Sequence, residues 1–164
     1  MITITRAVLL AAATLSLVSA AHAAPPAATF VAKAGASDMY EMKSSKLVLA
    51  SKNADVKTFA TQMVSDHTKS TAQVKAAAMK SGLHPKPPFM NAQQKKDIAA
   101  LTAVHGAARD TLYVQQQKAS HQAALDLMQD EASTGDKPAL KDAAAEIVPV
   151  VQHHIEMLNA MPAA

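Results

Sequence analysis

Apolar residues recur every three or four positions along four long segments of this chain, with polar residues between them. In residues 53–80 the apolar face runs through Val56, Phe59, Met63 and Val74. That spacing places side chains on one face of an α-helix, whereas a half-buried strand alternates every second residue. The pattern therefore predicts an all-α protein in which each long helix buries one face.

Capping and helix-breaking residues give the predicted helix boundaries. Gly82 ends the second helix, and the prolines of residues 84–88 exclude a helix there. Asn91 and Gln94 have the spacing of a capping box, which opens a short helix. The predicted helices cover residues 29–52, 53–80, 91–104, 107–132 and 136–160.

The connections between these segments predict the fold. The first two helices and the last two are joined by short links, so each pair forms an antiparallel hairpin. Two hairpins that bury their apolar faces against each other make an up-down four-helix bundle with one short extra helix. We expect both hairpin turns at the same end of this bundle.

The first 23 residues differ from the rest of the chain. Arg6 precedes an apolar run of about 14 residues, which ends in the A-x-A pattern Ala21-His22-Ala23. The run is shorter than the roughly 20 residues of a membrane-spanning helix. We expect a signal peptide over residues 1–23, cleaved after Ala23, and a flexible tether at residues 24–28. The mature protein, without a transmembrane segment, is then periplasmic, with outer-membrane association left open.

Composition and net charge exclude several kinds of fold, site and partner. The chain has no cysteine, which excludes disulfides and thiolate metal sites. Only 3% of its residues are aromatic, which argues against a β-sandwich or barrel. Removing residues 1–23 takes away one of 16 basic residues and none of the 13 acidic ones, so the net charge falls from +3 to +2. This charge is too small to predict a nucleic-acid partner.

Polar side chains interrupt the apolar faces at similar heights. His67, His121 and His154 each occupy the apolar face of their helix, and Glu41 does so in the first helix. At 1.5 Å per residue, Glu41 and His67 lie roughly 18 and 21 Å from the first turn. The other two lie roughly 22 and 27 Å from the second turn. With both turns at one end, all four meet near the middle of the bundle.

Met63-Val64-Ser65-Asp66-His67 resembles the M-V-x-D-H motif of the bacterial domain of unknown function 4142. Further matching positions are Phe59, Ala60, Gly106, Asp110, Tyr113, His121, Pro149 and His154. Arg109 departs from the family pattern, which has an aromatic residue there, and His153 leaves open which of two neighbouring histidines faces the core. The resemblance implies an exported protein with a ferritin-like bundle over residues 29–161, and it implies no activity.

Three imidazoles and one carboxylate form a ligand set that suits Zn²⁺, Cu²⁺ or Fe²⁺. We predict a single divalent or Cu(I) ion held by Glu41, His67, His121 and His154; nearby methionines are the reason for including Cu(I). A di-iron centre is not expected, because ferritin-like di-iron sites use Glu-x-x-His motifs and the chain has none. The alternative is a buried hydrogen-bond network without metal.

The sequence predicts no catalytic residues. We expect a protein without enzymatic activity that binds a metal ion or an envelope protein, in stress response or metal handling. One alternative is a structural or interaction module with an apolar patch on residues 91–104 or near Arg109. Another is a metal-dependent redox or hydrolytic enzyme, which needs an open coordination position and a pocket. The oligomeric state and the metal stay open.

Overall fold

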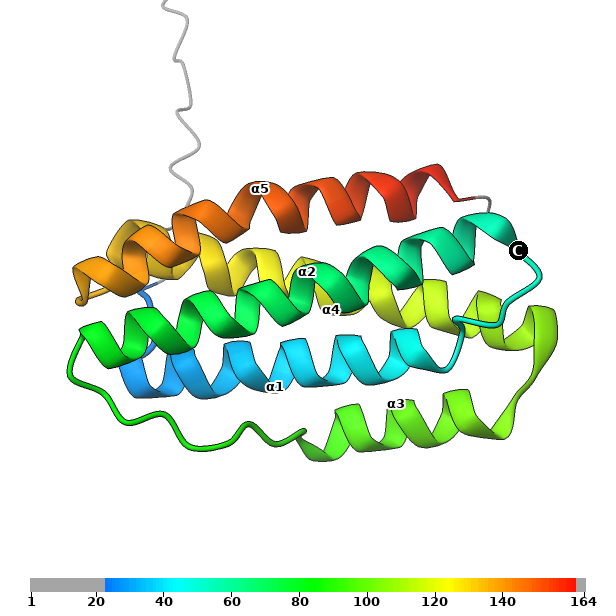
Figure 1. Ribbon diagram of the computed structural model, residues 1–164, viewed down its shortest axis with the longest axis horizontal. Helices are drawn as coiled ribbons and strands as arrows, with labels where there is room; N and C mark the ends of the chain where they lie inside the picture. The colour runs from blue at the N-terminus through cyan, green and yellow to red at the C-terminus, as the bar shows by residue number, and fades with distance from the viewer. Residues whose placement is uncertain (1–22, 162–164) are drawn as a thin grey trace, which may run out of the picture.

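The computed structural model describes residues 23–161, which are helical with short connections (Figure 1). The all-α prediction is confirmed for this part of the chain. Its helices are α1 (Ala27–Lys46), α2 (Ala54–Lys80), α3 (Ala92–Ala103), α4 (Gly106–Thr134) and α5 (Pro138–Ala160). Apart from Ala23, the predicted signal peptide lies outside the described residues. No helix within residues 23–161 is long and apolar enough to cross a membrane.

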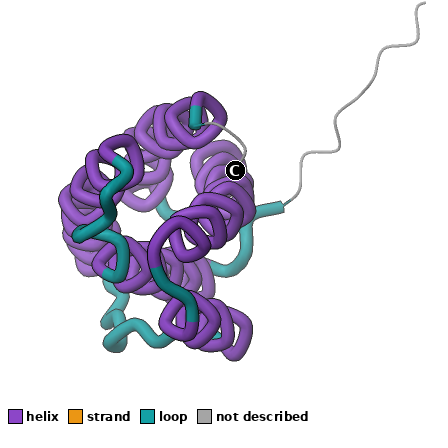
Figure 2. The backbone as a smooth tube through the Cα atoms, turned by 90° about the vertical axis from the view of Figure 1, so that its right-hand side faces the viewer, coloured by secondary structure: helices purple, strands orange, loops and turns teal. Residues whose placement is uncertain are grey.

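Four of the helices form the bundle, and α3 lies outside it. The two hairpins, α1 with α2 and α4 with α5, make the largest contacts. α2 also packs on α5, and α1 packs on α4, so the four helices enclose a common core. α3 packs on α1 and α4 from outside, as the view along the bundle shows (Figure 2).

The two hairpin turns lie at opposite ends of the bundle, which corrects the prediction that they share one end (Figure 1). Residues 81–105, including α3, run back along the bundle before α4 begins. The start of α4 therefore lies beside the end of α1, where Arg109 Nη1 donates to the carbonyl oxygen of Leu47 at 3.0 Å. A bundle with one long crossover is the ferritin-like arrangement. Local sequence patterns miss it because they do not give the direction of a long connection.

The helix ends differ from the predicted ones mainly in α1. This helix starts at Ala27, inside the segment predicted as a tether, and ends at Lys46 rather than at residue 52. The amide of Leu47 donates to the Ser44 carbonyl oxygen at 3.1 Å, which closes the last turn more tightly than an α-helix does. The chain then turns so that Val48 is buried in the core.

Asparagine side chains cap the starts of α2 and α3. The Asn53 side chain accepts from the amides of Asp55 and Val56 at the start of α2. At α3, Asn91 Oδ1 accepts from the Gln94 amide, and Gln94 Oε1 accepts from the Asn91 amide, each at 2.9 Å. This reciprocal pair is the predicted capping box.

A layer of polar side chains divides the apolar core into two clusters. One cluster lies towards the α4–α5 turn and includes Phe30, Val74 and Met128. The other lies towards the α1–α2 turn and includes Phe59 and Tyr113. The buried polar residues between them are Asp38, Glu41, Ser44, Ser45, His67, Ser70, Gln117, His121 and His154. Burying so many polar groups costs free energy unless they are satisfied by each other or by a ligand.

Candidate metal centre

Three histidines from three different helices meet in the polar layer. His67 of α2 is 4% exposed, and His121 of α4 and His154 of α5 are fully buried. Their ring centroids are 5.4 to 5.7 Å apart, and the His67–His154 pair falls within this range. One ring nitrogen of each lies within 4.8 Å of a ring nitrogen of the other two. We refer to His67, His121 and His154 as the histidine cluster.

The histidine cluster forms although the two hairpin turns lie at opposite ends. His67 lies at the midpoint of the 27-residue α2, and His121 lies near the middle of α4, whereas His154 lies six residues before the end of α5. Reversing the direction of a helix about its centre moves a central residue by only a few ångströms, at about 1.5 Å per residue. The predicted meeting of His67 and His121 therefore survives the correction in topology, and His154 lies at the same level in the structure.

One nitrogen of each ring is held by a hydrogen bond to the surrounding protein. His67 Nδ1 bonds to Asp38 Oδ1 at 2.8 Å. His121 Nδ1 bonds to the carbonyl oxygen of Gln117 at 2.9 Å. His154 Nε2 bonds to Asp66 Oδ2 at 3.2 Å. These acceptors fix the orientation of each ring and leave its second nitrogen for another partner.

The second nitrogen of each ring has no hydrogen-bond partner. The three atoms are His67 Nε2, His121 Nε2 and His154 Nδ1, and all are buried. Buried polar atoms in proteins are almost always paired, so three unpaired nitrogens in one cluster need a physical reason.

Glu41 lies beside the histidine cluster, against two of its rings. Its Oε1 accepts from Ser120 Oγ at 2.7 Å and lies 3.6 Å from His121 Nδ1. Its Oε2 lies 3.2 Å from His67 Nδ1. Together with Asp38 and His67, Glu41 forms a second group of potential ligands whose atoms lie within 4.8 Å of one another. The four residues singled out by the sequence are thus neighbours, but Glu41 belongs to this second group.

The structure also distinguishes the two adjacent histidines of α5. The side chain of His153 is 58% exposed and lies 3.7 Å from the exposed Glu156 carboxylate, whereas the side chain of His154 is fully buried. His154 is therefore the residue that faces the core.

The pKa values of the three histidines differ because their electrostatic surroundings differ. Burial lowers the pKa of His67, but Glu41 and the hydrogen bond to Asp38 outweigh it and raise the pKa to about 9. Burial and the charge of His67 lower the pKa of His121. Burial and the neighbouring histidines lower the pKa of His154 to about 4. Without a metal ion, the cluster thus carries its positive charge on His67 at neutral pH.

The sequence analysis did not single out Asp38. It lies three residues before Glu41 on the same face of α1 and is 3% exposed. Extending the spacing of three and four from Glu41 reaches Asp38 on one side and Ser45 on the other, so the signal was present. Asp66 bonds both to His154 of α5 and, at the surface, to Lys69 at 3.1 Å.

Aromatic side chains close the site towards the α1–α2 turn. The ring of Phe59 lies 6.1 Å from that of His121 and 5.9 Å from that of His154. Tyr113 Oη bonds to Ser45 Oγ at 2.8 Å, so its polar end is satisfied. The fully buried ring of Phe59 thus covers His121 and His154 on this side.

Two surface grooves approach the site through hydroxyl groups. One, of about 1190 Å³ between α1, α3 and α4, is lined by Ser120, whose hydroxyl donates to Glu41. The other, of about 590 Å³ beneath the proline-rich segment 84–88, is lined by Thr71. Thr71 Oγ1 donates to Asp38 Oδ2 at 2.8 Å. None of the three residues of the histidine cluster lines either groove. Each carboxylate of α1 is separated from a groove by one side chain, Ser120 or Thr71.

Comparisons with other proteins agree on the fold. The sequence model of the family described as "Domain of unknown function (DUF4142)" matches residues 12–161. The crystal structure of a DUF305 fragment from Deinococcus radiodurans superposes with a TM-score of 0.71 and 16% identity, over 84% of this chain and 95% of that one. At this identity the likeness concerns the fold alone. No curated protein matches the sequence.

Proposed function

The chain belongs to the DUF4142 family, whose function is unknown, and from its site we propose that it binds a transition-metal ion through His67, His121 and His154. Imidazole nitrogen is a good ligand for Zn²⁺, Cu²⁺ and Fe²⁺. Ligand nitrogens about 2.0–2.1 Å from a tetrahedral ion lie roughly 3.4 Å from one another. The structure brings one nitrogen of each ring within 4.8 Å of a nitrogen of the other two, close to that spacing.

The single observation that supports this proposal is the set of three unpaired, buried ring nitrogens. A hydrogen-bond network without metal would leave these nitrogens unsatisfied, at a cost of about 1–3 kcal/mol for each. One ion satisfies all three at once. The metal-free network is therefore the weaker explanation of the cluster.

The groups around the rings support the same proposal. In protein metal sites, the nitrogen that does not bind the ion usually donates to a carboxylate or a backbone carbonyl. Asp38, Gln117 and Asp66 provide these acceptors for His67, His121 and His154, respectively. The two carboxylates also bring negative charge that offsets the charge of the ion.

We also propose a cellular location for this function. The expected signal peptide at residues 1–23 supports a role in the cell envelope, in metal handling or stress response. An ion from that compartment would reach the site past Ser120 or Thr71, the groove-lining residues nearest to the carboxylates. Recovery of the protein from the cytoplasmic fraction alone would contradict this location.

Metal analysis of the purified protein tests the proposal. The protein is stripped with a chelator, reloaded separately with Zn²⁺, Cu²⁺ or Fe²⁺, desalted and analysed for bound metal. We expect at least one ion per chain for one of these metals, and a higher unfolding temperature in its presence, because an ion that binds only the folded state stabilises it. His121→Ala and His154→Ala lose this ion and its stabilisation.

His153→Ala is the matched control, because His153 adjoins His154 but is exposed. It keeps the ion and the shift in unfolding temperature. Substoichiometric binding of all three metals, unchanged by His67→Ala, would overturn the proposal and leave the buried network as the explanation.

A further inference from the structure

A separate group of potential ligands surrounds Nδ1 of His67, the ring nitrogen that bonds to Asp38. Its Nδ1 lies 2.8 Å from Asp38 Oδ1 and 3.2 Å from Glu41 Oε2. A single N–H makes one strong hydrogen bond, and the closer acceptor is Asp38. Glu41 Oε2 is left buried without a hydrogen-bond partner.

Hydroxyl groups orient both carboxylates towards His67. Thr71 donates to Asp38 Oδ2 at 2.8 Å, and Ser120 donates to Glu41 Oε1 at 2.7 Å. The remaining oxygen of each carboxylate faces Nδ1 of His67. This arrangement holds two oxygens and one nitrogen around the same point, inside the protein.

Neither Asp38 nor Glu41 pairs with a lysine or arginine side chain within the described residues. Within residues 23–161, the ion pairs of Asp38 and Glu41 are with histidines and not with lysine or arginine. Asp38 is 3% exposed and Glu41 is fully buried. Buried carboxylates need partners, and in the part of the chain that the structure describes the His67 ring is the group that faces both of them.

We infer that Asp38, Glu41 and Nδ1 of His67 bind a second divalent cation, so that the His67 ring bridges two ions. Two carboxylate oxygens and one imidazole nitrogen suit Zn²⁺, Fe²⁺ or Cu²⁺. The proton on Nδ1 leaves to solvent when this ion binds, and the ring then coordinates through both nitrogens. The inference rests on the proposed function for the first ion, which occupies the histidine cluster.

The competing explanation is that Asp38 and Glu41 only orient His67 for one ion. Carboxylates in that supporting role are common around metal-bound histidines. The two explanations differ in stoichiometry, since the supporting role predicts one ion per chain and the bridged site predicts two.

Stoichiometry and magnetic resonance of the copper(II)-loaded protein test the inference. We expect the wild-type protein to bind two ions and Asp38→Asn, which keeps the size but loses the charge, to bind one. Two copper(II) ions joined by one imidazole ring are magnetically coupled, so the wild-type EPR intensity per copper falls below that of Asp38→Asn. Glu41→Gln is the second variant, and helical circular dichroism checks that both variants fold.

His153→Ala serves as the control for adventitious binding at the surface and keeps two ions. His121→Ala retains the second ion, because its ligands are unchanged. One ion in the wild type would overturn the bridged site and leave the proposed function standing, whereas no ion would overturn both. Two ions in both Asp38→Asn and Glu41→Gln would also overturn it, since the second ion would then lie elsewhere.

Discussion

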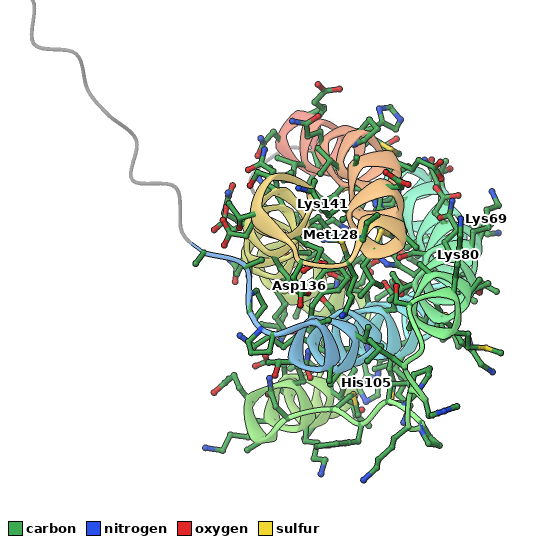
Figure 3. The ribbon with its side chains drawn as sticks, turned by 90° about the vertical axis from the view of Figure 1, so that its left-hand side faces the viewer. Lys69, Lys80, His105, Met128, Asp136 and Lys141 are labelled. Atoms are coloured by element: carbon green, nitrogen blue, oxygen red, sulfur yellow. The ribbon has the colours of Figure 1, made fainter. Side chains whose placement is uncertain are left out.

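Glu131 is a buried carboxylate near the end of α4, away from the histidine cluster. Its side chain is fully buried, and neither oxygen has a hydrogen-bond partner. Figure 3 looks onto this end of the bundle, where Met128, Asp136 and Lys141 are labelled. Burial raises the pKa of Glu131, Asp136 raises it further, and Lys141 opposes them. The ionised carboxylate therefore destabilises the folded protein.

Glu131→Gln is expected to increase the free energy of unfolding at neutral pH, because it removes a carboxylate whose charged form the folded protein disfavours. A pKa raised in the folded state means that wild-type stability is full below the unfolded pKa and falls as pH rises through the folded value. The difference in free energy of unfolding between variant and wild type therefore disappears at about pH 3. Urea unfolding at both pH values measures it.

The exposed Glu156 provides the control for this substitution. Its carboxylate side chain is 78% exposed, so Glu156→Gln should leave the free energy of unfolding unchanged at either pH. A Glu131→Gln protein that is less stable than wild type at neutral pH would show that the carboxylate has a stabilising partner.

Among the elements, the junction between α3 and α4 depends on Arg109. Its Nε donates to the Val104 carbonyl oxygen at 2.7 Å, and its Nη1 donates to the Leu47 carbonyl oxygen at 3.0 Å. Nη2 lies 2.8 Å from His105 Nδ1. In the sequence, Arg109 is a departure from the family pattern. In the structure, this residue connects the end of the crossover to the end of α1.

Arg109→Lys is expected to destabilise the fold by about 1–2 kcal/mol, because lysine keeps the charge but cannot donate from a planar fork to several carbonyl groups. The free energy of urea unfolding measures the effect. Lys95→Arg, at an exposed position on α3, is the control and should leave stability unchanged. Equal stability of Arg109→Lys and wild type would mean that the hydrogen bonds of Arg109 do not hold α4 in place.

At the scale of the whole molecule, two histidines make the stability of the metal-free protein depend on pH. The pKa of His67 rises from 6.5 to about 9 on folding, so its contribution is full below pH 6.5 and is lost as pH rises through about 9. The pKa of His154 falls from 6.5 to about 4, so stability is lost as pH falls from 6.5 through about 4. The metal-free protein is therefore expected to be most stable near pH 6.5.

Thermal unfolding in chelator over a range of pH measures this profile. His67→Gln is expected to flatten the alkaline side, and His154→Gln the acidic side. A bound ion replaces the protons on the rings, so the metal-loaded protein should lose stability at acidic pH, where protons compete with the ion. A metal-free wild type whose stability does not change between pH 6.5 and about 9 would contradict the role of His67.

The sequence by itself determined the helices, their buried faces and the residues that interrupt those faces. His67, His121 and His154 could be identified because helical periodicity is local: a residue's face follows from neighbours three and four positions away. The central positions of His67 and His121 in their helices also made the meeting of these two residues insensitive to helix direction. Asp38 was accessible by the same reasoning, since it shares the face of Glu41.

The tertiary structure decided the route of the crossover, the choice of His154 over His153, and the nitrogen that each ring leaves unpaired. It also placed Glu41 with Asp38 against one face of His67 rather than among the three histidines. These features depend on how each helix is rotated about its axis against its neighbours. That rotation is set by packing between residues far apart in the chain, which no local pattern records.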